Sequence, residues 1–270
     1  MNPTPTIAPR PVVVAISGHD PSGGAGIQAD IETLGSLGCH PASVLTAVTV
    51  QDTRGVQGYT ALDPVLIVEQ ARAVLEDMPA AAIKIGMLAD VAAVEAVHTL
   101  LRDYPHLPVV LDPVLSAGGG GSLAAEGVAE ALNHLLLPMT TVLTPNGPEA
   151  RTLAPEADNL EACAMALLDR GCRFVLITGA HEPTPKITNR LYGDYRLLDA
   201  ASWERLPGEY HGSGCTLAAA VAGLLAQGRD PLGAAREAQR FTWEALRHGY
   251  RPGMGQYVPE RRFRSGRSRN

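Results

Sequence analysis

The chain has 270 residues, 46% of them hydrophobic and 19% charged, a composition that is ordinary for a soluble globular protein. Its formal net charge of −6 argues against a general nucleic-acid-binding surface, which needs an excess of lysine and arginine. No apolar run is long enough to span a bilayer, so we expect neither nucleic acid nor a membrane as a partner.

Short β-like runs alternate with helical periods from the N-terminus onward. The predicted strands cover residues 11–17, 42–50, 81–88, 107–113, 140–145 and 173–179. The predicted helices cover residues 25–38, 64–78, 91–104, 123–136 and 161–171, and two more begin at Cys215 and Pro231. Residues 187–200 have the pattern of a β-hairpin about the sequence YGDY.

Repeated strand–helix units predict a mainly parallel sheet with helices on both faces. No linker rich in proline and serine divides the chain, so we expect one three-layer α/β/α domain over residues 1–259. Residues 260–270 are basic and lack apolar periodicity, which is typical of a disordered tail.

Ligands of such sheets sit beyond the carboxyl ends of the strands. The segments that follow the predicted strands are rich in glycine and polar residues, and we expect them to cluster at one edge of the sheet. These segments are SGHDPSGGAG, VQDTRG, IGML, DPVLSAGGGG, TPNGPE and TGAH.

Another glycine-rich stretch, HGSGCT, precedes the alanine-rich helix near the C-terminus. Gly212 and Gly214 let the main chain approach a ligand closely, and the helix start exposes N–H groups with partial positive charge. The stretch therefore predicts a phosphate cradle, although the chain contains no Walker P-loop. Cys215 lies in the first helical turn, where the pKa of a thiol tends to fall. The alternative is a simple turn before a helix that holds a buried cysteine.

Several strand-end residues allow two interpretations. The run from Gly24 has the G-x-G-x-x-A pattern of a dinucleotide site, but extra residues separate it from the strand, so a plain turn fits as well. Asn146 and Glu149 suit a hydrated Mg²⁺, and they also fit a capping box at a helix start. Asp112 is either a functional acid or part of an Asp–Pro turn.

The four cysteines form no C-x-x-C pair, so no zinc or iron–sulfur site is predicted. We expect Cys39, Cys163 and Cys172 in the core as small hydrophobic residues. The N-terminal residues contain no long apolar stretch of the signal-peptide type. These observations predict a reducing, cytoplasmic setting.

Taken together, the motifs resemble one family. SGHDPSGGAGIQADI, KIGML, LDPV, TPNGPEA and HGSGCT occur in the order and spacing of the hydroxymethylpyrimidine/phosphomethylpyrimidine kinases of thiamine biosynthesis, which belong to the ribokinase-like superfamily. The likeness runs from about residue 11 to about residue 259. It implies a ribokinase-like fold and ATP-dependent phosphorylation, first of 4-amino-5-hydroxymethyl-2-methylpyrimidine and then of its monophosphate.

The resemblance also implies roles for individual residues. The anion hole for the transferred phosphoryl group would consist of the main-chain N–H groups of Gly212, Ser213, Gly214 and Cys215, with the Cys215 thiol as base. The nucleotide and Mg²⁺ would be bound by Asn146, Glu149, Asp112 and Thr178, with Glu149 as the metal ligand. The pyrimidine would be bound by Gln51, with Gly18, Asp30 and Met87 near its ring.

The chain departs from the family in two loops. Residues 178–181 read TGAH where relatives often read KGGH, so a lysine near the nucleotide phosphates is missing, and residues 116–123 are unusually rich in glycine. The nearest alternative function is a pyridoxal or pyridoxine kinase, which would share the fold and differ in the ring pocket. More distant alternatives are an NAD(P)-dependent oxidoreductase and a pyrimidine sensor without activity. A homodimer stays open, because strand edges and hairpins often pair subunits in this superfamily.

Overall fold

Six parallel strands form the centre of the sheet in the computed structural model, which describes residues 9–116, 123–182 and 184–263. Antiparallel strands extend both edges and give the order β3-β2-β1-β4-β5-β6-β7-β8-β9. The strands are β1 (Val12–His19), β2 (His40–Gln51), β3 (Val56–Ala61), β4 (Ala80–Ile85), β5 (Val109–Leu111), β6 (Val142–Leu143), β7 (Phe174–Ile177), β8 (Lys186–Gly193) and β9 (Arg196–Glu204).

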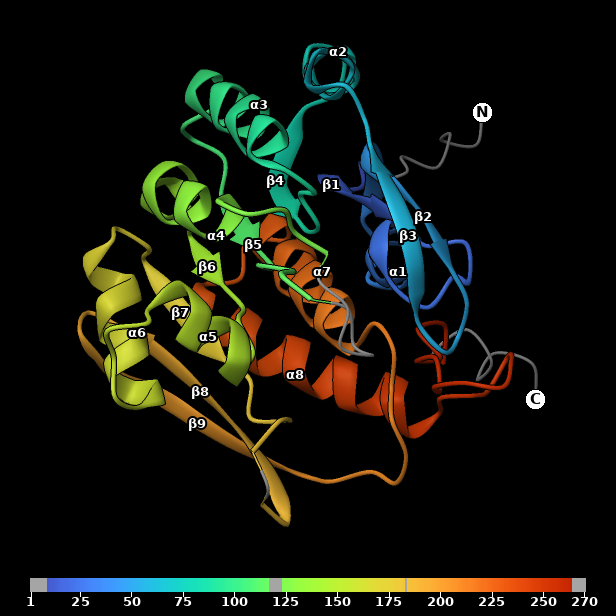
Figure 1. The fold of residues 1–270 in the computed structure, drawn as a ribbon, viewed down its shortest axis with the longest axis vertical. Helices are drawn as coiled ribbons and strands as arrows, with labels where there is room; N and C mark the ends of the chain where they lie inside the picture. The colour runs from blue at the N-terminus through green and yellow to red at the C-terminus, as the bar shows by residue number, and fades with distance from the viewer. Residues whose placement is uncertain (1–8, 117–122, 183, 264–270) are drawn as a thin grey trace, which may run out of the picture.

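Helices cover both faces of this sheet (Figure 1), which confirms the predicted three-layer α/β/α architecture. One face carries α1 (Gly26–Ser36), α7 (Ser213–Ala226) and α8 (Pro231–Arg247). The other face carries α2 (Pro64–Leu75), α3 (Val91–Asp103), α4 (Val128–Ala131), the π-helical turn η1 (Leu132–Leu136), the 3₁₀ turn η2 (Leu137–Met139), α5 (Gly147–Leu153) and α6 (Leu160–Asp169).

The structure differs from the predicted elements in two places and decides one open alternative. The helix expected from residue 123 begins only at Val128, because Gly127 adopts a left-handed φ of 83° that interrupts the helical geometry. Strand β3 was not predicted, since its exposed sequence has no apolar run and only pairing with β2 holds it in place. The capping interpretation of Asn146 is confirmed by α5.

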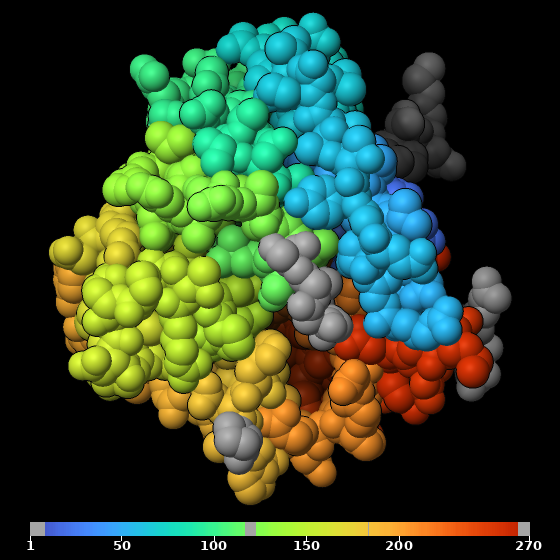
Figure 2. Space-filling view, viewed as in Figure 1, coloured from blue at the N-terminus to red at the C-terminus, as the bar shows by residue number. Residues whose placement is uncertain are grey.

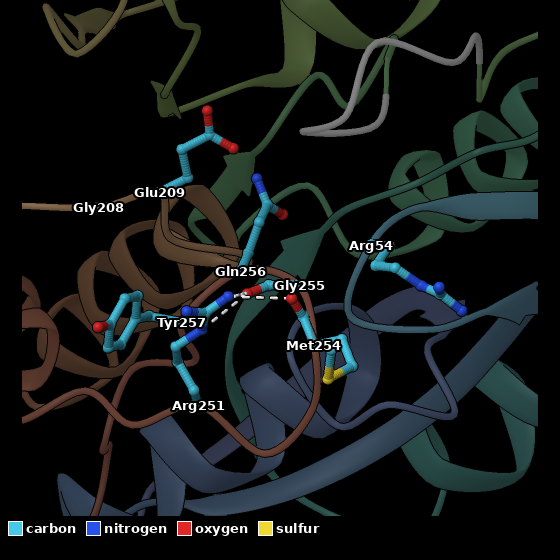
Figure 3. A pocket seen from close by; sticks show the side chains of 8 residues that line it. All are labelled: Arg54, Gly208, Glu209, Arg251, Met254, Gly255, Gln256 and Tyr257. Carbon is cyan, nitrogen blue, oxygen red and sulfur yellow. Dashed lines mark hydrogen bonds between the residues drawn. The ribbon is translucent and has the colours of Figure 1, made fainter.

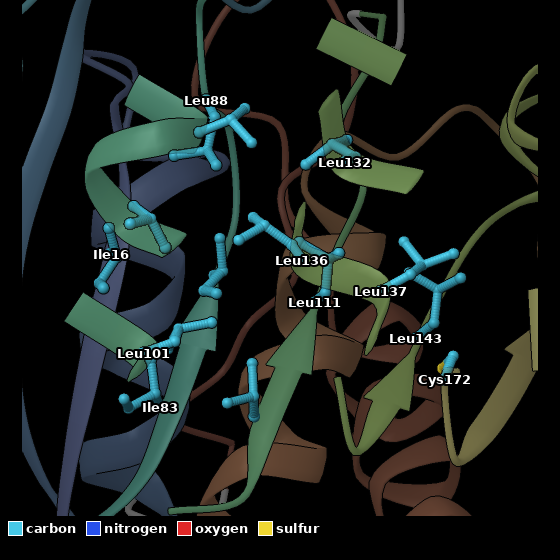
Figure 4. Packing of buried hydrophobic residues seen from close by; sticks show 14 of the residues in the cluster. Ile16, Ile83, Leu88, Leu101, Leu111, Leu132, Leu136, Leu137, Leu143 and Cys172 are labelled. Atoms are coloured by element: carbon cyan, nitrogen blue, oxygen red, sulfur yellow. The ribbon is translucent and has the colours of Figure 1, made fainter. Parts of the chain in front are cut away.

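Each face of the sheet has its own apolar core. The core under α2 to α6 is made of branched side chains such as Ile83, Leu111 and Leu136 (Figure 4). The core on the opposite face is built around α7, whose residues from Thr216 to Leu224 are all buried. Six of the nine residues of this stretch are alanine, glycine or threonine, and such small side chains let α1, α8 and the sheet approach α7 closely.

The boundary drawn at residue 260 is wrong for the first tail residues. Glu260 to Phe263 belong to the fold, and the side chain of Arg261 is fully buried. The basic character of this segment predicted solvent exposure, but its first arginine finds hydrogen-bond acceptors inside the protein. No helix in the part of the chain that the structure describes is long and apolar enough to cross a membrane.

The tight packing of α7 gives a stability prediction. Ala220 is 0% exposed, so Ala220→Leu should overpack the core and lower the free energy of unfolding by about 1–3 kcal/mol. Ala92 lies exposed in the first turn of α3, and Ala92→Leu should change the free energy of unfolding by less than about 0.5 kcal/mol. Denaturant unfolding of both variants checks this, and equal effects at the two positions would contradict the packing argument.

Candidate active site

The predicted clustering of strand-end segments is confirmed. Because β1, β2 and β4 to β7 are parallel, their carboxyl ends meet at one edge of the sheet. Figure 2 shows a hollow in the surface bordered by yellow, orange and red segments of the second half of the chain. The HGSGCT stretch reaches the same edge, since a Cβ on Gly214 would lie 3.8 Å from Oδ1 of Asp112.

The N-terminus of α7 has the geometry expected of an anion cradle. Gly212 is its N-cap with a left-handed φ of 79°, and Ser213 and Gly214 are the first helical residues. The amide of Thr216 donates to the Gly212 carbonyl at 3.0 Å, so the amides before it have no partner within the helix. The four residues predicted for the anion hole therefore lie together at the start of a 14-residue helix.

Two glycine-rich loops pack directly against each other at this point. A Cβ on Gly212 would overlap the carbonyl oxygen of Gly24, and a Cβ on Gly24 would overlap the ring of His211. Gly26, with φ of 59°, in turn touches the Gly18 carbonyl. The glycines of the GGAG run thus allow close packing of loops, which favours the interpretation of a turn over that of a dinucleotide site.

A buried ion pair lies beneath the cradle. Nζ of Lys84 is 2.8 Å from Oδ2 of Asp30, and both side chains are 0% exposed. Asp30, predicted near the substrate ring, is thus held inside the protein, because a buried ammonium needs a counter-charge. Lys84 was not predicted as a site residue, although a lysine inside the apolar run AAIKIG was a visible signal.

The Lys84 ammonium lies between three acidic groups. Burial lowers the pKa of Lys84, but Asp30, Cys215 and Asp112 outweigh burial and raise this pKa above its usual range. Burial raises the pKa of Asp112 to about 6, against the opposing charge of Lys84. The second carboxylate oxygen of Asp112, Oδ2, is buried without a hydrogen-bond partner among the described residues.

The start of the helix tends to lower the pKa of a thiol, but this influence does not prevail at Cys215. Desolvation raises the pKa of the Cys215 thiol to about 12, and the charge of Lys84 opposes this only in part. Removal of solvent from the sulfur outweighs the helix dipole and the nearby ammonium. The thiol is therefore protonated near neutral pH, and it donates a hydrogen bond to Asp112.

Asn146, Glu149 and Thr178 lie together at the ends of β6 and β7. The Asn146 side chain accepts from the Glu149 amide and Glu149 accepts from the Asn146 amide, both at 2.9 Å. Asn146 and Thr178 form a parallel β-bridge. Burial, and next the negative charge of Asp112, raise the pKa of Glu149 to about 8. The capping box thus holds Glu149 at the sheet edge, within the electrostatic influence of Asp112.

On the other side of the cradle, Gln51 joins a polar cluster. Nε2 of His211 is 2.7 Å from Nε2 of Gln51 and 2.8 Å from Oδ2 of Asp20. Asp20 also accepts from the amides of Ser22 and Ala25. Burial opposes ionisation of Asp20, but the bonds to His211 and Ser22 prevail and lower its pKa to about 2.

Gly18 and Met87 are neighbours, as predicted. A Cβ on Gly18 would lie 3.0 Å from the Met87 sulfur, and the Met87 carbonyl accepts a hydrogen bond from Thr46 at 2.6 Å. Gln51 and Gly18 thus lie at the carboxyl ends of β2 and β1, and Met87 follows the adjacent strand β4. Asp30 is the one predicted pyrimidine contact that the structure does not bring to this surface.

The loop of residues 251–257 borders two hollows beside the polar cluster of Gln51, His211 and Asp20. One hollow, of about 410 Å³, is lined by Arg54, Glu209, Arg251, Gln256 and Tyr257, among others (Figure 3). The second, of about 400 Å³, is reached by Gln51, Ser22, Pro252 and Met254 among its lining residues. The loop therefore forms an outer wall on the side of Gln51. Residues 117–122 of the other glycine-rich loop lie outside the described residues.

The acidic groups fit a divalent cation in one respect. Asp112 and Glu149 are buried carboxylates whose pKa values are raised chiefly by burial, and Oδ2 of Asp112 has no hydrogen-bond partner among the described residues. Carboxylate oxygens are the ligands that Mg²⁺ prefers. Within the described residues, however, no group of three or more His, Cys, Asp or Glu side chains converges on a single point, so a protein-only metal cage is absent.

The profile of the family described as phosphomethylpyrimidine kinase matches residues 20–260. The chain belongs to the phosphomethylpyrimidine kinase family. It is 40% identical over 265 residues to a hydroxymethylpyrimidine/phosphomethylpyrimidine kinase of Streptomyces coelicolor, covering 94% of both chains. A thiamine biosynthesis bifunctional protein of Geobacter sulfurreducens is 38% identical over 260 residues. This chain covers 51% of that bifunctional relative, about half its length.

Members of this family share their fold with solved vitamin kinases. A structure of Bacillus subtilis pyridoxal kinase in complex with ADP has a TM-score of 0.85 to this chain at 27% identity. The match covers 94% of this chain and 98% of that one. The ribokinase-like fold expected from the motifs is thereby confirmed.

The polar cluster around Asp20 gives a pH-dependent prediction. Its pKa falls from 3.8 to about 2 on folding, which is worth about 2 kcal/mol. A depressed carboxyl pKa stabilises the fold above pH 3.8, and this stability is lost as the pH falls toward 2. Asp20→Asn should therefore lower the free energy of unfolding near pH 7, and the deficit should shrink below about pH 4.

Denaturant unfolding across pH 3–7 measures this deficit. Asp63→Asn is the matched control, because Asp63 caps α2 at an exposed position and asparagine caps equally well; its effect should stay below about 0.5 kcal/mol. A deficit of Asp20→Asn that is the same at pH 3 and pH 7 would contradict the assignment.

Proposed function

We propose that this protein transfers the γ-phosphoryl group of ATP to the hydroxymethyl group of 4-amino-5-hydroxymethyl-2-methylpyrimidine, and then phosphorylates the monophosphate. Relatives that match along nearly their whole length carry the names of both activities. One observation carries the proposal: the free amides at the start of α7 face the same sheet edge as Asp112, Asn146 and Glu149. Phosphoryl transfer needs such charge stabilisation and alignment more than covalent help.

The two substrates would approach the cradle from opposite sides. The pyrimidine lies at the ends of β1, β2 and β4, where Gln51 supplies hydrogen bonds and Gly18 leaves room beside Met87. The nucleotide lies at the ends of β6 and β7, beside Asn146 and Thr178. The γ-phosphorus then comes next to the N-terminus of α7, between the two sites.

The proton of the substrate hydroxyl needs an acceptor. Cys215 is protonated at rest, so a simple thiolate base is not available. We propose that the sulfur takes the hydroxyl proton while its own proton passes to Asp112, which is mostly ionised at neutral pH because its pKa is about 6. The alkoxide oxygen forms the bond to the γ-phosphorus as the bond to the ADP oxygen breaks.

Mg²⁺, when bound with ATP, would neutralise charge on the phosphate oxygens. Glu149 is the residue of this chain that would hold it, directly or through water. Thr178, which follows β7 and pairs with Asn146, would contact the phosphates. The protonation state of Glu149 would then depend on the cation and on the hydrogen bond that Glu149 accepts from the Asn146 amide.

We also propose a cytoplasmic location and a homodimer. Cys39, Cys163, Cys172 and Cys215 are free thiols, which suits a reducing compartment. Val48, Val50 and Tyr59 are exposed apolar side chains of the paired strands β2 and β3. A second subunit covering these side chains would account for their exposure.

Product analysis tests the function. The purified protein, incubated with ATP, Mg²⁺ and hydroxymethylpyrimidine, should yield the monophosphate first and the diphosphate later, resolved by mass. Pyridoxal is the parallel substrate, because the fold is also that of a solved pyridoxal kinase. Turnover of pyridoxal with higher kcat/KM than the pyrimidine would replace the proposal with that alternative, and turnover of neither would reject both.

The proton relay predicts the behaviour of Cys215→Ala. We expect kcat to fall by about 10²–10⁴-fold, the usual worth of general acid–base help, with a much smaller rise in the KM of the pyrimidine. Cys39→Ala is the matched control, since Cys39 is a buried thiol in the core beside α7 and should leave kcat unchanged. Steady-state kinetics on both variants measure this. Near-full turnover in Cys215→Ala would exclude Cys215 as the proton acceptor and leave the main-chain amides as the only contribution of this loop.

A further inference from the structure

Arg261 lies at the junction of three segments that are far apart in the sequence. Its side chain is 0% exposed. Nε donates to Oγ1 of Thr216 at 2.9 Å, Nη1 donates to the Gly23 carbonyl at 3.3 Å, and Nη2 donates to the Gly24 carbonyl. Nη1 also pairs with the partly exposed Glu32 at 3.2 Å.

These bonds lead directly to the anion cradle. Because Oγ1 of Thr216 accepts from Arg261, its own hydrogen goes to the Gly212 carbonyl, 2.7 Å away. On the other side, the Gly24 carbonyl that Arg261 holds is the atom that a Cβ on Gly212 would overlap. Arg261 therefore fixes the N-cap of α7 both from behind, through Thr216, and from the side, through Gly24.

The backbone before Arg261 strengthens the same connection. Tyr257 pairs in parallel with the segment that enters the cradle: its amide donates to Glu209 at 2.8 Å and its carbonyl accepts from His211 at 2.9 Å. The Glu260 amide then donates to Ala245 in α8 at 2.9 Å. Hydrogen bonds at Tyr257 and at Glu260 thus hold this short segment in place, which limits the movement of Arg261.

We propose that Arg261 is a positioning residue for phosphoryl transfer, which locks the amides of the α7 N-terminus in register with the Gly23–Gly24 loop beside the substrate. This inference rests on the proposed kinase function. A guanidinium suits the task because its planar fork holds several carbonyl and hydroxyl oxygens at fixed angles, whereas an ammonium has no such fork. The amides must be aligned before the phosphoryl group arrives, because an electrostatic cradle acts through preorganisation.

Kinetics of two neighbouring arginines separate this role from a general effect of charge. Arg261→Met should lower kcat by about 10²-fold, the usual cost of a displacement of about 1 Å, while KM changes much less. Arg261→Lys should recover part of kcat, since it keeps the charge and fewer of the bonds. Arg262→Met is the control: Arg262 pairs with the same Glu32 but is 66% exposed, and kcat should not change.

Amide hydrogen exchange gives a readout that does not depend on activity. In Arg261→Met, a peptide covering residues 209–217 should exchange faster than in Arg262→Met, while peptides from α3 exchange as in the parent. An inactive parent protein would reject the kinase function, and the exchange data would still decide the positioning role. Equal exchange and equal kcat in the two methionine variants would overturn the proposal.

A second pair of variants covers the case in which Arg261→Met does not fold. Thr216→Val keeps the shape of the side chain but removes the link from Arg261 to Gly212, and kcat should fall by about 10-fold, the worth of one lost hydrogen bond. Thr242→Val is its control, because the buried hydroxyl of Thr242 has no partner among the described residues. Parent-like kcat in Thr216→Val would count against the proposed route through Thr216.

Discussion

The ammonium group of Lys84 is the charge on which the rest of the site depends. It lies beneath the α7 N-terminus, fully buried, and pairs with Asp30 while sharing its field with Asp112 and Cys215. Without this cation, the carboxylates of Asp30 and Asp112 would repel each other away from solvent, and no nearby polar group would offset that repulsion. Asp30 thus serves as the counter-ion of Lys84, and Asp112 forms no ion pair within 4.0 Å among the described residues.

Glycine contacts provide the geometric counterpart of this charge. The Gly24 carbonyl occupies the space of a missing side chain on Gly212, so the loop after β1 and the start of α7 cannot move independently. His211, next to Gly212, extends the same connection to Gln51 and Asp20. Contacts on the substrate side and the phosphate side therefore form one continuous structure, in which Arg261 is the only buried guanidinium among the described residues.

Residues that form local motifs could be predicted from the sequence. The parallel sheet followed from alternating apolar runs. The cap at Asn146 and the helix start in the HGSGCT stretch followed from helix-start chemistry, which depends on neighbours in the chain. Lys84, the partner of Asp30, and Arg261 were missed because their partners lie 54 and 45 residues away or more. A basic residue within a polar tail carries no local signal of burial. Its carbonyl acceptors are known only once the fold is known.

Burial limits how much negative charge the acidic groups around Lys84 hold near neutral pH. Asp30, Asp112 and Glu149 could bring three negative charges against the one positive charge of Lys84. Burial shifts this balance toward protons, which is why the pKa of Glu149 rises to about 8 and the Cys215 thiol keeps its hydrogen. Surplus negative charge is costly in a buried site, so phosphates bound there in the proposed reaction would need compensating charge: the amides of α7 on one side and a cation carried by the nucleotide on the other.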